Sequence, residues 1–306
     1  MSKLARLPTL TLWGQRSRQT AVTLVTLLRA GVTIRSLVLG SAAPSVDRPR
    51  RPPLAPWSDD PADLARRIGI PTIPVRQRQE LETILDRDEP LADCALVSCF
   101  PWRIPRSIYE RYPLGMLNIH PSPLPDYRGP SPLFWQYRDG CLRTAVTLHR
   151  ITEELDAGPI VAQVACDLPL GFPGDRLESW LAWYGTGLAL EYLQSGTIEK
   201  PQHAHPALRS WAPSPRQEDR TVAPDWPAWR VAHFLAGVLP LGYRALVRDG
   251  QGQLFRIERF VAWTSRPGRA PLESRVLYLR FGDSWITVEA TALQSEDRVG
   301  RSVLRQ

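Results

Sequence analysis

This chain of 306 residues is predicted to be an α/β protein, with a mostly parallel sheet flanked by helices and a small, mostly β domain after it. In the first two thirds, short apolar runs rich in β-branched residues alternate with helical stretches, which is typical of a parallel sheet covered on both faces. After residue 215, several strand-like runs follow one another with glycines beside them, which indicates a small sandwich or barrel. The proline-rich segment 197–215 is the predicted linker, so the predicted domains are 1–196 and 216–306.

The elements follow from apolar spacing and from the residues that end helices. Gly31 and Gly69 follow the first two helical stretches, where a left-handed residue ends a helix. The run 94–100 is almost continuously apolar, which indicates a strand buried on both faces. In the first domain, strands are predicted at 9–12, 32–39, 71–75, 94–100, 115–120, 144–150 and 160–167, and helices at 19–30, 61–68, 79–87, 105–112, 130–139 and 176–193. In the second domain, a helix is predicted at 227–239 and strands at 243–248, 254–263, 274–281 and 285–293.

The composition limits the location and the partners. The formal net charge is +7, and a basic chain favours polyanionic partners such as nucleic acid. No apolar run approaches the roughly 18–20 residues that span a bilayer, and the first residues lack the apolar core of a signal peptide. The four cysteines show neither Cys-x-x-Cys spacing nor a nearby histidine at ligand spacing. We therefore expect a cytoplasmic protein with no membrane partner, no disulfide framework and no metal.

Three polar residues that stand among turn-forming prolines and glycines carry the groups that an acid–base site acting on a carbonyl uses: an amide, an imidazole and a carboxylate. Asn118 and His120 stand two positions apart near the end of one predicted strand, so their side chains share a face. Open α/β sheets bind their ligands at such strand ends. An amide N–H and a protonated imidazole stabilise a developing oxyanion, and a carboxylate from Asp156 favours the charged imidazole and helps a proton move.

Taken alone, these residues also fit a purely structural interpretation. An Asn-x-His sequence at a strand end often does no more than bond a backbone carbonyl. Asp156 lies in the turn-like sequence Asp-Ala-Gly-Pro, where the side chain often forms an Asx-turn. Residue type and spacing leave both interpretations open.

The sequence at 118–129, Asn-Ile-His-Pro-Ser-Pro-Leu-Pro-Asp-Tyr-Arg-Gly, resembles a motif of the folate-dependent formyltransferases. That family includes enzymes acting on methionyl-tRNA, on glycinamide ribonucleotide and on nucleotide sugars. The segment 145–149, which leads to Leu-Asp-Ala-Gly-Pro-Ile at 155–160, is similar to the second family motif. The resemblance implies that Asn118, His120 and Asp156 are catalytic, and that a Rossmann-like sheet precedes an OB- or barrel-like C-terminal domain.

The same resemblance implies where the folate binds. The segment 95–105 is similar to the family segment whose backbone lines the pterin pocket, and 122–125 matches the other folate-contacting stretch. The implied folate-binding residues are Phe100, Trp102, Arg103, Ile104, Ser122, Pro123, Leu124 and Pro125. On the acceptor side we expect Gly14 of the first loop, Arg50 of an arginine-rich loop, and the Arg128-Gly129 pair of the first motif.

The chain departs from the family mainly where the family's cleft faces the acceptor. The first loop reads Trp-Gly-Gln-Arg-Ser-Arg at 13–18 in place of a Gly-Thr-Pro-type sequence, and Pro130-Ser131 stand where small residues are common. Pro123 replaces a leucine, and Glu153-Glu154 replace an acidic-Gly pair. The three implied catalytic residues are all retained.

The reaction implied by the resemblance is transfer of a formyl group from 10-formyltetrahydrofolate to a primary amine. Two acceptor classes fit the sequence. Initiator methionyl-tRNA is favoured by the net charge, by the arginines at 48–51 and by a C-terminal part that resembles that of the methionyl-tRNA enzyme. A small amine, either an amino sugar or a biosynthetic amino acid, is favoured by the altered first loop. A formyltetrahydrofolate hydrolase and a non-catalytic RNA-binding relative are further alternatives, although the complete set of catalytic residues argues against the non-catalytic one.

Overall fold

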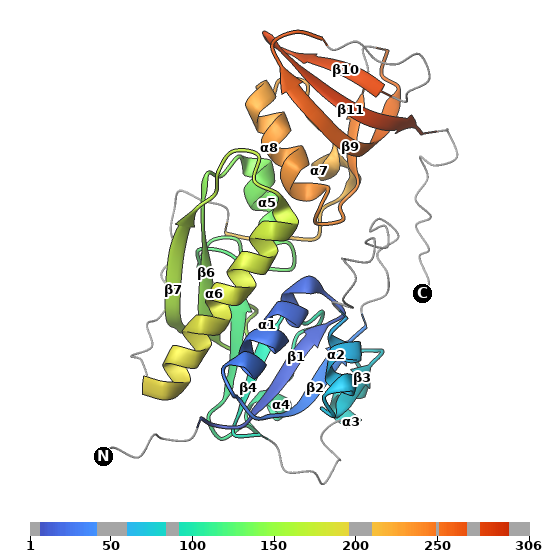
Figure 1. Cartoon of the computed structure of the whole chain (residues 1–306). Coiled ribbons are helices and arrows are strands. Elements are labelled where there is room, and N and C mark those ends of the chain that lie inside the picture. The colour runs from blue at the N-terminus through green and yellow to red at the C-terminus, as the bar shows by residue number, and fades with distance from the viewer. Residues whose placement is uncertain are drawn as a thin grey trace.

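The computed structural model describes residues 7–41, 60–83, 92–195, 210–248, 251–267 and 276–293 (Figure 1). Within these residues, none of the helices is long and apolar enough to cross a membrane. Arg50 and its loop, most of the predicted linker, and residues 84–87 of a predicted helix lie outside the described residues.

Seven strands form the central sheet in the order β3-β2-β1-β4-β5-β6-β7. The five strands from β1 to β5 are parallel, and β6 and β7 are antiparallel to their neighbours. The direction of winding reverses between β1 and β4, and such a switch point is where open α/β sheets bind ligands. The strands are β1 (Leu10–Gln15), β2 (Ile34–Gly40), β3 (Thr72–Val75), β4 (Cys94–Ser98), β5 (Met116–His120), β6 (Arg143–Arg150) and β7 (Ile160–Asp167).

Helices cover both faces of this sheet. On one face α1 (Arg18–Arg29) packs beside the long α6 (Gly174–Ser195), and the two are linked by a hydrogen bond between Thr186 and Thr23. Gly185 of α6 lets that helix lie close to the sheet, because a Cβ there would stand 2.4 Å from Ile119. The other face carries a separate apolar cluster closed by α4 (Arg106–Tyr109). The shorter α2 (Pro61–Arg67) and α3 (Glu80–Thr83) flank β3.

The C-terminal part is a four-stranded antiparallel sheet in the order β10-β11-β9-β8. Its strands are β8 (Ala245–Arg248), β9 (Leu254–Thr264), β10 (Val276–Phe281) and β11 (Ser284–Ala292). It is preceded by α7 (Gln217–Arg220) and by α8 (Ala228–Val238), which lies between the two sheets (Figure 1).

The predicted fold class is confirmed, and most predicted elements are found within a few residues of their expected ends. The four-residue helix α7 was missed, because so short a helix shows no apolar period. The domain boundaries at 196 and 215 stay a prediction.

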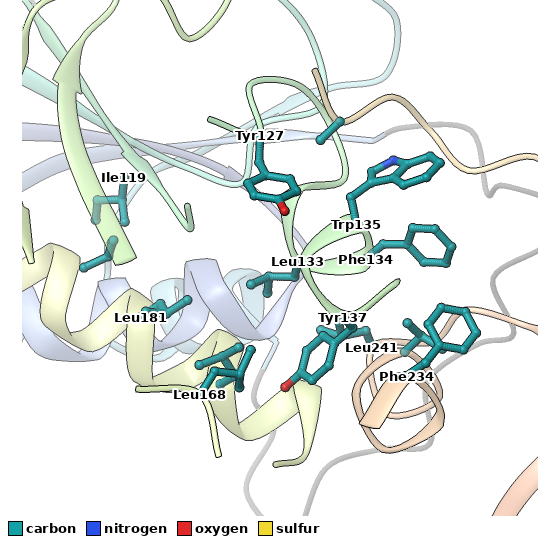
Figure 2. Packing of buried hydrophobic residues seen from close by; sticks show 14 of the residues in the cluster. Ile119, Tyr127, Leu133, Phe134, Trp135, Tyr137, Leu168, Leu181, Phe234 and Leu241 are labelled. Carbon is teal, nitrogen blue, oxygen red and sulfur yellow. The ribbon is translucent and has the colours of Figure 1, made fainter. Parts of the chain in front are cut away.

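Aromatic packing joins the two parts. Phe134 of α5 (Pro132–Asp139) contacts Phe234 of α8 with ring centroids 5.7 Å apart, and Tyr137 lies beside them (Figure 2). Gly237 of α8 lies directly against the Tyr137 ring, which is fully buried. The main apolar cluster therefore runs without interruption from the central sheet into the C-terminal part.

Gly237→Ala is expected to lower the free energy of unfolding by about 1–3 kcal/mol, because a core cannot absorb an added methyl group without moving. A Cβ at Gly237 would lie 2.1 Å from Cδ1 of Tyr137. Gly187→Ala is the matched control, since Gly187 is an exposed helical glycine with nothing within 4 Å of a Cβ. Thermal and urea unfolding measure both variants. Equal stability of Gly237→Ala and wild type would contradict this packing.

A buried histidine also joins the two parts. His233 of α8 donates from Nε2 to the carbonyl of Cys141, at 2.9 Å, and its Nδ1 accepts the backbone N–H of Gly171, at 3.1 Å. Both contacts together require a neutral ring, because a protonated Nδ1 has no lone pair with which to accept a hydrogen bond. Burial lowers the pKa of His233 below its ordinary value of 6.5.

The free energy of unfolding is expected to fall as the pH drops below about 6.5. The unfolded chain then takes up a proton that folded His233 does not bind, so stability is complete above the unfolded pKa and is lost below it. His120, whose pKa is also lowered by burial, adds to the same slope. Urea unfolding between pH 7.5 and 5 measures the slope, and His233→Gln removes the contribution of His233. The same slope in His233→Gln and wild type would exclude the His233 contribution.

Candidate active site

A cavity of about 630 Å³ opens at the carboxyl ends of β1, β4 and β5. Asn118, His120 and Asp156 line it, together with the loop after β4 and with Ser214, Arg220 and Tyr243 from the C-terminal side. The three residues singled out from the sequence therefore meet in one cavity, although 36 positions separate His120 from Asp156. The cavity is closed by both parts of the chain.

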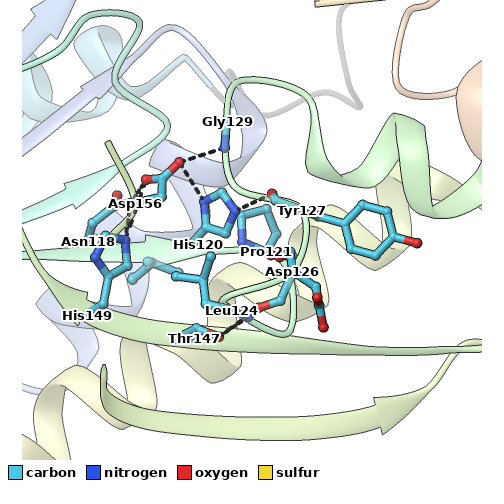
Figure 3. Close-up of polar contacts among 12 residues, drawn as sticks. Asn118, His120, Pro121, Leu124, Asp126, Tyr127, Gly129, Thr147, His149 and Asp156 are labelled. Atoms are coloured by element: carbon cyan, nitrogen blue, oxygen red, sulfur yellow. Dashed lines mark hydrogen bonds and ion pairs between the residues drawn. The ribbon is translucent and has the colours of Figure 1, made fainter. Parts of the chain in front are cut away.

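Strand register decides what lies beside Asn118. In the antiparallel pairing of β5 with β6, Asn118 is opposite His149, and the two side chains are on the same face of the sheet. Nδ2 of Asn118 lies 3.0 Å from Nε2 of His149 and 3.4 Å from Oδ1 of Asp156 (Figure 3). Both hydrogens of this amide are therefore directed at protein atoms.

Asp156 reaches the two strands through a turn that only certain residues can build. It has a φ of 53°, in the left-handed region, where Asp and Asn are among the tolerated non-glycine residues. Gly158 follows because a Cβ there would lie 2.0 Å from the carbonyl oxygen of Arg150. Gly129 has a φ of 113° and donates its N–H to Oδ2 of Asp156 at 2.9 Å. The glycines of both motifs thus serve to place one carboxylate.

His120 is buried and is held at both nitrogens. Nε2 donates to the carbonyl oxygen of Tyr127 at 2.9 Å, and Nδ1 lies 3.7 Å from Oδ2 of Asp156 (Figure 3). Burial lowers the pKa of His120 below 6.5, and this outweighs the opposite influence of Asp156. The ring is therefore neutral at neutral pH, whereas the sequence led us to expect a protonated one. Nδ1 is left as the nitrogen that can take a proton.

Asp156 is ionised at neutral pH. Burial, the largest single influence, raises the pKa of this carboxyl group, but His120, His149 and the N–H of Gly129 together lower it to about 2. An anion beside a neutral imidazole stabilises the imidazolium that forms when Nδ1 accepts a proton. The pair is arranged to receive a proton during a reaction rather than to hold one beforehand.

The residues predicted on the folate side divide into two groups. Phe100, Trp102, Arg103 and Ile104 line the cavity. Ser122, Pro123, Leu124 and Pro125 do not line it; they form a turn beside His120, in which Thr147 donates to the carbonyl of Ser122 at 2.7 Å. Gln163 bonds the carbonyl of Leu124 at 2.9 Å, so β6 and β7 hold the turn that carries Tyr127. Folate contact by these residues stays a prediction.

Of the described residues predicted on the acceptor side, Gly129 lines the cavity, whereas Gly14 and Arg128 do not. Gly14 does not line it, since it packs against Thr20, but Gln15 does. Gly129 lines the cavity, and Arg128 forms an ion pair with Glu154 at 3.6 Å.

Sequence reasoning missed His149, Gln15, Arg220 and Tyr243 as residues of this cavity. His149 was part of the quoted second motif, and its place one strand away from Asn118 follows only from the pairing register. Arg220 and Tyr243 belong to the C-terminal side, and no local pattern connects them with the first motif. Within the described residues, no group of three or more His, Cys, Asp or Glu side chains is arranged to hold a metal ion.

Known structures share this fold. A methionyl-tRNA formyltransferase from Clostridium thermocellum has a TM-score of 0.60 at 14% identity, with 94% of this chain and 100% of that chain covered. An N-formyltransferase from Helicobacter canadensis, in complex with folinic acid and dTDP-3-aminofucose, has the same TM-score, identity and coverage. At this identity the likeness concerns the fold alone.

Sequence relatives are closer. A methionyl-tRNA formyltransferase from Roseiflexus castenholzii is 30% identical over 207 residues, which are 61% of this chain and 66% of that protein. In four such relatives the match spans only 55–66% of their length. The methionyl-tRNA formyltransferase of Syntrophus aciditrophicus is 31% identical over 232 residues, which are 72% of this chain and 71% of the relative.

Residues 60–178 match the family model described as formyl transferase, and this range includes Asn118, His120 and Asp156. The family expected from the two motifs is thus confirmed by the model match and by the Syntrophus relative. This chain belongs to the formyltransferase family.

Proposed function

We propose that this protein transfers the formyl group of 10-formyltetrahydrofolate to a primary amine. The observation that carries the proposal is the meeting of Asn118, His120 and Asp156 in one cavity that the loop 100–104 also lines. Membership of the formyltransferase family supports the reaction, and folinic acid in the Helicobacter structure supports a folate donor. The aromatic and apolar loop side chains suit a pterin ring.

The proton balance of this reaction matches the state of His120. The amine attacks the formyl carbon, and its nitrogen becomes positive as the carbonyl oxygen becomes negative. Nδ1 of neutral His120 takes a proton from that nitrogen while Asp156 stabilises the imidazolium. The proton then passes to N10 of the folate as the C–N10 bond breaks. The products are the formamide and tetrahydrofolate, and no proton is gained or lost.

Methionyl-tRNA is the acceptor we propose first. The relatives named above are methionyl-tRNA formyltransferases. The C-terminal sheet also presents exposed arginines: Arg248 and Arg280 donate to the carbonyls of Gly252 and Gly282 and keep their positive charge at the surface. Neighbouring Arg259 is instead paired with Glu289, so the positive charge of this sheet is partly balanced.

A small amine is the second candidate. It is favoured by the Helicobacter enzyme, whose structure holds an amino sugar nucleotide, and by the closure of the cavity from the C-terminal side by Arg220 and Tyr243. A cavity closed in this way suits a compact acceptor more readily than a long acceptor stem.

The two acceptors are separated by one assay. Purified protein is incubated with 10-formyltetrahydrofolate and either charged initiator tRNA or a set of amines that includes a nucleotide-linked amino sugar. Formylated methionyl-tRNA, with a steep fall in rate as salt rises, identifies the first class. Salt-insensitive formylation of a small amine identifies the second.

The same assay tests the remaining alternatives. Formate release without any amine, and no formyl product with one, would identify a hydrolase. Neither formate nor formyl product in any mixture would contradict formyl transfer and favour a non-catalytic relative. A cytoplasmic location stays a prediction from the sequence.

A further inference from the structure

We infer that His149 is a positioning residue that turns the carbonyl oxygen of Asn118 toward the cavity, so that Asn118 accepts a hydrogen bond from the attacking amine. The inference rests on the proposed transfer to an amine and assigns an orientation to one residue of that site. It reverses the simplest expectation for an asparagine beside a formyl group, which is that its N–H holds the oxyanion.

The orientation begins with a backbone carbonyl. Nδ1 of His149 lies 2.9 Å from the carbonyl oxygen of Arg150, and a carbonyl oxygen only accepts. Nδ1 therefore carries a proton, and when the ring holds this single proton Nε2 presents a lone pair. His149 is buried, so this lone pair must be met by a protein donor.

That donor is the side-chain amide of Asn118, whose Nδ2 lies 3.0 Å from Nε2 of His149. The second hydrogen of the same nitrogen is directed at Oδ1 of ionised Asp156, at 3.4 Å. Turning the amide over would place its oxygen against a lone pair and against a carboxylate, which costs two hydrogen bonds and adds repulsion. Two independent acceptors thus determine one orientation.

The consequence lies on the cavity side. With both hydrogens of Asn118 bound by His149 and Asp156, its carbonyl oxygen is the polar atom that remains for a ligand, and Asn118 lines the cavity. An amine N–H bonded to this oxygen is held in place for attack. The bond strengthens as the nitrogen becomes positive, so it favours the transition state over the ground state.

The orientation is measured without turnover. In ¹⁵N-labelled protein, long-range ¹H–¹⁵N correlation reports which nitrogen of His149 carries the proton, and His149→Gln identifies its signals. We expect the Nδ1–H form at neutral pH and slowed exchange of the Asn118 amide hydrogens. A proton on Nε2 would overturn the inference. This result does not depend on the acceptor or on formyl transfer, so it is separate from failure of the proposed function, which shows as inactive wild type.

The effect of His149 on the reaction is measured by how the formyl group is divided between the amine and water. His149→Gln keeps a polar side chain but allows either amide orientation, and we expect kcat for the amine to fall about 10- to 100-fold with the KM for 10-formyltetrahydrofolate unchanged. Attack by water needs no aligned amine, so the ratio of formate to formylated product should rise. His233→Gln, which replaces a buried histidine outside the cavity, should leave that ratio unchanged. Wild-type kcat in His149→Gln, or an unchanged ratio despite a lower kcat, would contradict the positioning role.

Discussion

His120→Ala is expected to lower kcat for formyl transfer by about two to four orders of magnitude, the usual contribution of a positioned acid–base group. The variant removes Nδ1 of His120, which lies 3.7 Å from Oδ2 of Asp156 and is the proposed acceptor for the proton of the attacking amine. Single-turnover kinetics with 10-formyltetrahydrofolate and the amine identified by the acceptor assay measure the effect.

Binding should survive this substitution, because the cavity walls from the loop after β4 are untouched. The affinity for folinic acid is therefore expected to stay near the wild-type value, and added imidazole is expected to restore part of the rate. Turnover of His120→Ala at the wild-type rate would show that His120 is not the proton acceptor.

Asp156→Asn is expected to reduce kcat about 100-fold and to move the acid limb of the pH–rate profile to lower pH. Asn tolerates the left-handed backbone at this position, where φ is 53°, so the change removes charge with little strain. Asp156 raises the pKa of His120 against the effect of burial, and its loss lowers that pKa further. Neutral His120 is the active form, so the rate is sustained above its pKa and falls below it.

The direction in which the acid limb moves distinguishes the loss of the Asp156 charge from a loss of structure. A variant that is merely misfolded loses rate at every pH, without moving the limb. Measuring kcat from pH 5 to 8 in wild type and Asp156→Asn gives the comparison, with urea unfolding as the control for stability. An acid limb at the same or higher pH in Asp156→Asn would exclude the electrostatic role assigned to this carboxylate.

Much of the fold was predictable because its signals are local. Apolar runs ended by Gly31 and Gly69 marked the first strands and helices, and both glycines have a positive φ in the structure. Asn118, His120 and Asp156 were singled out because the two motifs resemble those of the formyltransferase family; residue type and spacing alone left a structural interpretation open. Gly129 and Gly158 are needed for close backbone approach, which is why the motifs contain them.

The rest depended on contacts between distant segments. No spacing rule places His149 opposite Asn118, since that requires the register of β5 with β6. The expected contact with the Asp156 carboxylate favoured a charged His120, and only the burial seen in the fold showed that the pKa of His120 is lowered. Gln15 lines the cavity, whereas Gly14, the residue before it in β1, packs against Thr20 of α1.

The fold class could be predicted from the chain alone, because apolar periodicity and turn-forming residues are properties of neighbouring positions. The family and the three polar residues were recognisable because two short motifs resemble those of the formyltransferases. The neutral imidazole of His120, the ionised carboxylate of Asp156 and the orientation of the Asn118 amide could be inferred only from the folded chain. Proton positions and pKa values depend on burial and on partners from other strands. Packing brings those partners together from distant parts of the chain, so no single segment of the sequence reveals them.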